Sequence, residues 1–248
     1  MRLRPVQTPS VVDAVYQQLR DSILSGALQV GELLPGERRL CEELGVNRGA
    51  LREALKRLEQ DQLILIQQGE STRVLDFRQT AHIDLLVQLL VRPTGELDPE
   101  VVRSVGELRA SINPDISRLA AQRRGPALAS EIRAAILGVE ASAGRYPAFA
   151  ERTEEFWSVL VEASQNVAYQ LLNNTIRKTH LRFWQEFRRS LEGSEFEDLQ
   201  RYRRLGEATL AGDAAGAEEL ARAWGREILL SFERNVHQLA RVPEEPTG

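Results

Sequence analysis

The first quarter of the chain alternates between helical and extended spacings of apolar residues. The apolar positions over 10–25 follow a helical period, which predicts a first helix. A short helix is expected over 37–44, and a longer one over 47–60 with Asn47 as its N-cap. Gly45 turns the chain between these two. Two helices joined by a short glycine-containing turn predict a helix-turn-helix.

Two short strands are expected directly after the helix-turn-helix. Residues 63–67 are rich in β-branched and aliphatic side chains, 68–71 have turn character, and 72–75 return to an extended pattern. A two-stranded hairpin at this position is a wing.

The second helix of this unit separates its apolar and basic residues. Its apolar stripe consists of Leu51, Leu55 and Leu58, and its basic stripe consists of Arg48, Arg52 and Lys56. Asn47 and Arg48 lie at the helix N-terminus, the end that enters the major groove when such a motif docks. A guanidinium there can bond guanine O6 and N7, whereas Arg52 and Lys56 suit phosphates. The alternative is a solvated helix face without function. The turn, the N-cap and the wing lie at the sequence spacings of a winged helix-turn-helix, which favours DNA binding.

The remainder of the chain is helical in period. A bundle of about seven helices is expected. The predicted ranges are 80–91, 98–124, 126–143, 147–164, 167–189, 196–211 and 214–240. The expected fold class is therefore mainly α, with an N-terminal winged helix-turn-helix (α+β) followed by an all-α effector domain.

Composition divides the 248-residue chain near residue 78. Residues 1–78 hold eleven Lys/Arg against eleven Asp/Glu, so the net charge of −4 comes from the rest of the chain. We expect a DNA-binding domain over 1–78, an effector-binding and dimerisation domain over 79–242, and a tail over 243–248. Because the net charge is negative, nucleic-acid binding must come from a local basic patch and not from the whole surface.

Several classes of protein are disfavoured by the sequence. No apolar run approaches the roughly 20 residues of a membrane span, and no secretory signal follows the N-terminus. Cys41 is the one cysteine, which excludes an internal disulfide and indicates a reducing cytoplasmic compartment. No phosphate-binding loop, dinucleotide fingerprint or hydrolase motif is present, so an enzyme is not expected.

The DNA-binding half resembles the GntR family of bacterial transcription regulators. The resembling segments are Leu34-Pro35-Gly36-Glu37-Arg38-Arg39-Leu40, Leu44-Gly45-Val46-Asn47-Arg48 and Leu51-Arg52-Glu53-Ala54-Leu55-Lys56-Arg57-Leu58. The resemblance implies operator contacts by Arg38, Arg48 and Arg52, and minor-groove entry by a wing tip at Gln68 and Gly69. Glu70 departs from the basic or small residue usual there, and its charge should weaken wing contact.

The helical half is similar to the effector domain of the FadR subgroup of that family. The resembling segments are Glu107-Leu108-Arg109, Arg118-Leu119-Ala120-Ala121, Glu155-Phe156-Trp157, Ala163-Ser164-Gln165-Asn166, and Gly212-Asp213 followed by Ala217. Many members hold a divalent metal through one aspartate and three histidines. The corresponding positions here are Thr153, Trp157, Tyr202 and Trp224, and none is a usual zinc ligand. His82, His180 and His237 lie on separate predicted helices, so no metal and no other cofactor is expected.

Loss of the metal ligands makes the chain more similar to the fatty-acid-responsive branch of the subgroup, which binds long-chain acyl-CoA. That resemblance implies an effector site containing Arg109, Trp224-Gly225 and Phe232, with Ile228 at a position where a small hydroxyl residue is expected. The residues at the other former metal positions, Thr153, Trp157 and Tyr202, are assigned to the same effector site. Core packing is the alternative for the aromatic residues. For Arg109 the alternative is a buried salt bridge to an acid such as Glu107 or Glu155.

The sequence as a whole predicts a cytoplasmic homodimer that binds an inverted-repeat operator through two winged helices. Its partners are double-stranded DNA and a small effector, with no membrane association. An acyl-CoA is the expected effector. A different organic acid sensed without metal and a ligand-free DNA-binding repressor are the alternatives.

Overall fold

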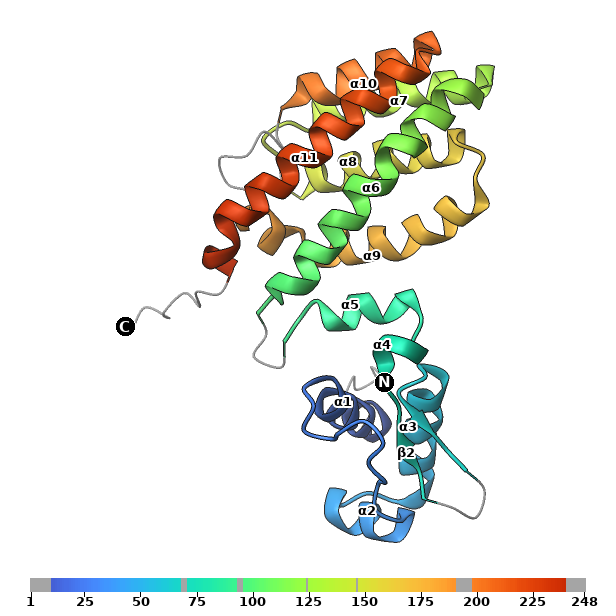
Figure 1. Cartoon of the computed structure of the whole chain (residues 1–248), viewed down its shortest axis with the longest axis vertical. Coiled ribbons are helices and arrows are strands. Elements are labelled where there is room, and N and C mark those ends of the chain that lie inside the picture. Colours follow the sequence, from blue (N-terminus) through green and yellow to red (C-terminus); the bar gives the residue numbers. More distant parts are fainter. Residues whose placement is uncertain are drawn as a thin grey trace, which may run out of the picture. The chain divides into compact units, whose positions relative to one another are not determined.

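The computed structural model describes residues 10–67, 71–92, 96–123, 125–145, 147–190 and 198–239 (Figure 1). Its contacts divide the chain into two compact units between Leu85 and Leu86. The predicted tail, 243–248, lies outside the described residues. No helix in the described ranges combines the length and apolarity that a membrane span requires.

The first unit is a winged helix-turn-helix, as the sequence predicts. Its elements are α1 Val11–Leu24, α2 Glu37–Leu44, α3 Arg48–Gln60, β1 Ile64–Leu65, β2 Arg73–Val74, α4 Phe77–Thr80 and the 3-10 helix η1 Ile83–Leu85. The strands pair antiparallel, with Ile64 opposite Val74 and Leu65 opposite Arg73.

Local signals form the turn between α2 and α3. Gly45 has φ of 66°, a left-handed conformation that glycine adopts without steric cost. The Asn47 side chain then accepts a hydrogen bond from the Ala50 backbone N–H at 2.9 Å, which caps the N-terminus of α3. The corner between the two helices is therefore specified by the residues within it.

The apolar stripe of α3 packs against α1. Leu51, Leu55 and Leu58 are buried, and α1 contacts this helix with its own buried residues. At the edge of the contact, Arg57 Nη1 lies 2.6 Å from Asp13 Oδ1. Burial of the leucines leaves the opposite face of α3 in solvent.

The second unit is a helical bundle. Its helices are α5 Leu86–Leu89, α6 Pro99–Arg123, α7 Pro126–Ala141, α8 Ala148–Ala163, α9 Val167–Ser190, α10 Leu199–Ala211 and α11 Ala214–Leu239. The predicted helices from residue 98 onward are confirmed, with ends that differ by a few residues. The mainly α fold class is confirmed for both units.

The single helix predicted over 80–91 is wrong. The chain there leaves α4 at Ala81, whose backbone is extended, and passes through η1 before α5 begins. The Leu85 N–H donates to the His82 carbonyl at 3.0 Å, a 3-10 pattern that interrupts a regular helix.

The proposed domain boundary at residue 78 falls within α4. This helix is bonded to the first unit, because the Thr80 hydroxyl donates to the Gln62 carbonyl at 2.8 Å. The division by contacts lies at Leu85, beyond η1.

The close approach of α6 and α11 organises the bundle (Figure 1). A Cβ atom on Gly225 would lie 3.0 Å from both the Cα and the Cβ of Ala110. One of these contacts is backbone, which cannot rotate away. The short distance between the two helices therefore leaves no room for a side chain at position 225, which must be glycine.

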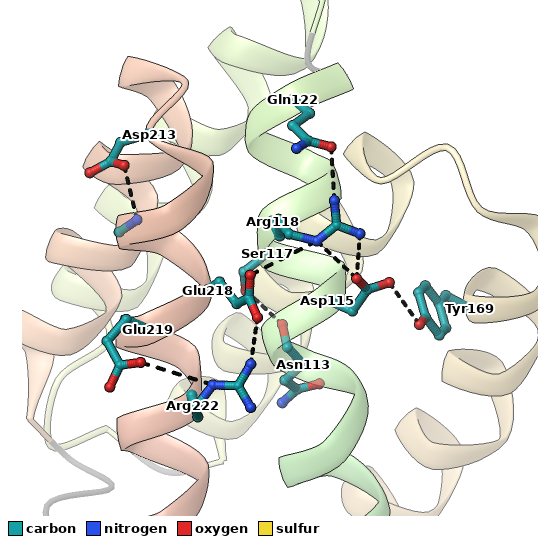
Figure 2. Close-up of polar contacts among 11 residues, drawn as sticks. Asn113, Asp115, Ser117, Arg118, Gln122, Tyr169, Asp213, Glu218, Glu219 and Arg222 are labelled. Carbon is teal, nitrogen blue, oxygen red and sulfur yellow. Dashed lines mark hydrogen bonds and ion pairs between the residues drawn. The ribbon is translucent and has the colours of Figure 1, made fainter.

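A polar network ties the middle of α6 to α9 and α11 (Figure 2). Asp115 accepts hydrogen bonds from Arg118 Nε at 3.0 Å and from the Tyr169 hydroxyl at 3.0 Å. Arg118 also lies 4.0 Å from Glu218 of α11. The hydrogen bonds from Arg118 hold the pKa of Asp115 below its usual value, although partial burial opposes the shift.

Substitution of Gly225 by Val is expected to reduce the free energy of unfolding by about 1–3 kcal/mol, because the added side chain must separate α6 from α11. Ala215→Val, at an exposed position of the same helix, is the control. Denaturant unfolding of the full chain measures both. Equal stability of the two variants would show that the close approach is not required.

The lowered pKa of Asp115 predicts an acid-dependent contribution to stability. A depressed carboxyl pKa stabilises the fold above the unfolded-state value of about 3.9, and this contribution is lost as pH falls below it. Asp115→Asn should therefore cost about 0.5–1 kcal/mol at pH 7, a value limited by solvent screening, and a smaller amount at pH 3, because the contribution is lost only as pH falls through the depressed folded-state pKa. Unfolding of wild type and variant at both pH values checks this, and a cost unchanged at low pH would contradict it.

Candidate nucleic-acid interface and effector site

The solvent face of α3 is basic. Arg48, Arg52 and Lys56 are all exposed, and their spacing of four residues places them along one side of the helix. Asn47 is also exposed, although its side-chain oxygen is used by the cap. The structure thus brings four of the predicted DNA-contacting residues together.

Two of the predicted arginines have acidic neighbours. Arg52 Nε lies 3.0 Å from both carboxylate oxygens of Glu37, at the start of α2. Arg38 lies 3.9 Å from Glu42, and its side chain is 83% exposed, so this pairing is weak. Within the described residues Arg48 and Lys56 form no ion pair, which leaves their charges free for nucleic acid.

The wing follows α3 as expected, and its strands are joined to the preceding loop. Leu33 bridges to Arg73, whose guanidinium donates to the Gly31 carbonyl at 3.1 Å. The predicted wing-tip contacts, Gln68 and Gly69, lie outside the described residues, as does Glu70. Their assignment stays a prediction.

Three of the four positions at which the subgroup's metal ligands are expected form an aromatic cluster in the bundle interior. Trp157 of α8, Tyr202 of α10 and Trp224 of α11 are at most 6% exposed. The ring centroids of Trp157 and Trp224 are 5.4 Å apart, and those of Tyr202 and Trp224 are 4.6 Å apart at near-perpendicular orientation. Such edge-to-face contacts are favourable, so the cluster is packed.

The fourth position, Thr153, is buried one turn before Trp157. Its hydroxyl donates to the Ala150 carbonyl at 2.9 Å, which satisfies it within α8. No group of three or more His, Cys, Asp or Glu within the described ranges has a metal-binding arrangement. The side chains of His180 and His237 lie outside the described part.

The indole of Trp224 places a buried hydrogen-bond donor in this cluster. Trp224 is 4% exposed, and its indole Nε1–H has no hydrogen-bond partner among the described residues. An unsatisfied buried donor costs about 1–3 kcal/mol. An acceptor brought by a ligand would recover part of that cost.

Arg109 forms a buried salt bridge, but with neither of the acids expected. Its Nη1 lies 3.1 Å from Oε1 of Glu154, whose side chain is 1% exposed. Glu107 instead lies 3.7 Å from Arg103, and Glu155 lies 2.5 Å from Arg152. Both expected partners point away because they lie on the outer faces of α6 and α8, whereas Glu154 faces inward.

The remaining predicted effector residues, Gly225, Ile228 and Phe232, do not lie together in one apolar cluster. Gly225 lies against Ala110, as described above. Phe232 belongs to a smaller apolar cluster with Leu90, Leu97 and Val102. Ile228 packs against both this cluster and the main core. Phe232 therefore does not belong to the same cluster as Trp157 and Trp224.

A surface groove of about 340 Å³ runs between α8 and α9. Its lining is mostly polar and consists of Ser158, Val161, Glu162, Gln170, Asn173, Asn174 and Arg177. The Ser158 hydroxyl donates to the Glu154 carbonyl at 2.8 Å, so one end of the groove lies a helical turn from the buried carboxylate.

Comparison with known proteins gives both halves a counterpart. Residues 11–74 match the model of the bacterial regulatory proteins of the gntR family, and residues 104–226 match the FCD domain. The regulator Mce2R of Mycobacterium tuberculosis is 36% identical over 222 residues, which cover 90% of this chain and 91% of Mce2R.

The chain belongs to the GntR family.

Further relatives agree with this family. The fatty acid metabolism regulator protein of Cronobacter sakazakii is 31% identical over 222 residues, covering 90% of each chain. Among solved structures, the Listeria monocytogenes protein Lar matches with a TM-score of 0.59 at 16% identity, covering 92% of this chain and 99% of Lar. This GntR-family protein is a DNA-binding transcription regulator with an effector-binding FCD domain, and not an enzyme.

The FCD domain of this GntR-family regulator does not fit a divalent metal at the four corresponding positions. An indole nitrogen that carries a proton has no lone pair for a metal, and two of the four positions are indoles. The threonine hydroxyl is used within its own helix.

Sequence reasoning missed Glu154. An acidic residue within the buried periodicity of α8, next to Thr153 and one turn before Trp157, was the available signal. Its partner could be identified only once α6 and α8 were placed side by side.

Arg48→Ala is expected to reduce operator affinity by about 1–3 kcal/mol and to relax preference at one base pair, because the exposed N-terminal arginine is placed to read a base edge. Lys56→Ala, two turns further along the same face, should weaken binding to all DNA sequences alike and reduce the salt dependence. Binding to operator and random DNA at several salt concentrations distinguishes them. Unchanged preference in Arg48→Ala would show that α3 is not the recognition helix.

Proposed function

We propose that this regulator acts as a homodimer on an inverted-repeat operator and that a fatty acyl-CoA, bound in the FCD domain, weakens operator binding. The dimer is inferred from the reach of α3, because one recognition helix covers only a few base pairs and two half-sites raise specificity. A cytoplasmic location follows from this role.

The observation that carries the effector proposal is the aromatic cluster at the positions of the metal ligands. Trp157, Tyr202 and Trp224 replace ionic ligands with apolar surface. A small dicarboxylate would lose its metal anchor there, and its charges would be costly to bury unpaired. An acyl chain needs no such anchor. The relative named as a fatty acid metabolism regulator supports the same class of ligand.

The energy of acyl burial is sufficient for a rearrangement of the bundle. Because the rings are in contact, a chain can enter only if they separate. Each buried methylene contributes about 0.8 kcal/mol, so a long chain offsets the loss of a few ring contacts. A ligand that binds the separated state more tightly shifts the protein toward it, and the winged helices then lose the spacing that the operator requires.

Two alternative functions are considered. If the tryptophans fill the interior permanently, the protein is a ligand-free DNA-binding repressor. If Arg109 alone anchors the effector, a different small organic acid is bound without metal.

Titration with acyl-CoAs of increasing chain length tests the proposal, with zinc plus citrate as the control. We expect affinity and melting temperature to rise with chain length and operator affinity to fall, because each added methylene is buried. Zinc and citrate should produce no change. No heat and no thermal shift at any chain length would overturn the acyl proposal, and zinc-dependent citrate binding would overturn the assignment of the four positions.

A further inference from the structure

The buried salt bridge between Arg109 and Glu154 has the composition of an occupied anion site. Glu154 is almost fully buried, and removing its charge from water is costly unless a cation accompanies it. Arg109 supplies that cation from the facing helix, at 3.1 Å. A carboxylate of the protein itself therefore occupies the guanidinium to which the anion of an effector would bind.

The site is accessible and has unused hydrogen-bonding capacity. The Arg109 side chain remains 22% exposed, and its bond to Glu154 uses one of five N–H donors. A second donor lies close in the fold: Trp224, whose Nε1–H lacks an acceptor among the described residues, precedes the Gly225 that packs on Ala110. The adjacent helices α6 and α11 thus each contribute a side chain with unused donor capacity.

We propose that Glu154 is an internal competitor of the effector, and that an anionic group of the ligand binds Arg109 by displacing the Glu154 carboxylate. This inference rests on the proposed effector function of the FCD domain. The anion is a phosphate or a carboxylate, because both accept hydrogen bonds from a guanidinium in the same geometry. Glu154 then makes the site selective for anions, because a neutral amphiphile cannot replace the negative charge with which Arg109 is paired.

Displacement also couples the site to the bundle. Glu154 and Trp157 lie three residues apart on α8 and share a helix face, and the Trp157 ring contacts that of Trp224 on α11. A Glu154 side chain that leaves Arg109 removes a bond between α6 and α8 at the edge of the aromatic cluster. Anion binding and ring separation are therefore expected to favour the same state.

Glu154→Gln in the full-length protein tests the proposal. Glutamine keeps the size of the side chain and can still accept a hydrogen bond from Arg109, but it carries no charge. We expect this variant to bind acyl-CoA about tenfold or more tightly than wild type, the difference of roughly one charge-assisted hydrogen bond. Glu155→Gln, which removes an exposed carboxylate next to it on α8, should bind as wild type does.

The ligand series identifies the group that Glu154 opposes. Acyl-CoA, the free fatty acid and the fatty alcohol of equal chain length are titrated into each protein. If Glu154→Gln binds only acyl-CoA more tightly than wild type does, the group that Glu154 opposes is a phosphate. If it binds both acyl-CoA and the free fatty acid more tightly, Glu154 opposes any anion. Equal tightening for the alcohol would overturn the proposal, because it would show a loosened bundle rather than a removed competitor.

Arg109→Gln provides the second control. If Glu154 acts through this arginine, Glu154→Gln should produce no gain in the Arg109→Gln background. Where Glu154→Gln does not fold, Glu154→Asp keeps the charge while shortening its reach, and a smaller gain is expected. Wild-type binding of acyl-CoA with no gain in either Glu154 variant would overturn this inference alone. No binding by any protein of the set would overturn the proposed function as well.

Discussion

The contact between α6 and α11 is the constraint on which the effector domain depends. Because Gly225 has no side chain, α11 approaches Ala110 closely, and the residues beside this contact are drawn together. Trp224, the residue before Gly225, contacts the rings of Trp157 and Tyr202, and Arg109, the residue before Ala110, pairs with Glu154 of α8. A wider spacing of α6 and α11 at this point would shift Trp224, the residue next to Gly225, relative to α6.

The DNA-binding unit depends on local interactions instead, and for that reason it was predictable. Asn47 caps α3 through a residue three positions away, and Gly45 forms the turn with its own backbone conformation. The spacing of Leu51, Leu55 and Leu58 sets which face of α3 is buried, and hence that Arg48 and Lys56 are exposed. None of these features requires knowledge of distant parts of the chain.

The effector site was predictable only in part, because its geometry depends on how helices far apart in the sequence pack. Alignment of motifs identified Trp157 and Trp224, but not that their rings touch. A buried salt bridge of Arg109 to an acid such as Glu107 or Glu155 was the alternative to ligand contact, and the packing of α6 on α8 selects Glu154 as that acid. The helix expected over 80–91 was lost because extended backbone at Ala81 overrides a weak apolar period. Phe232 likewise joined a cluster with Leu90 and Leu97 that no local pattern indicated.

On the proposed function, the effector acts by separating the aromatic rings of Trp157 and Trp224 inside the FCD domain. Tryptophan fluorescence of a Trp184→Phe variant measures this most directly, because Trp157 and Trp224 are then the remaining tryptophans of the chain. We expect acyl-CoA to change the intensity and wavelength of their emission over the same concentration range in which it releases operator DNA. Release of DNA by acyl-CoA with unchanged emission would contradict this.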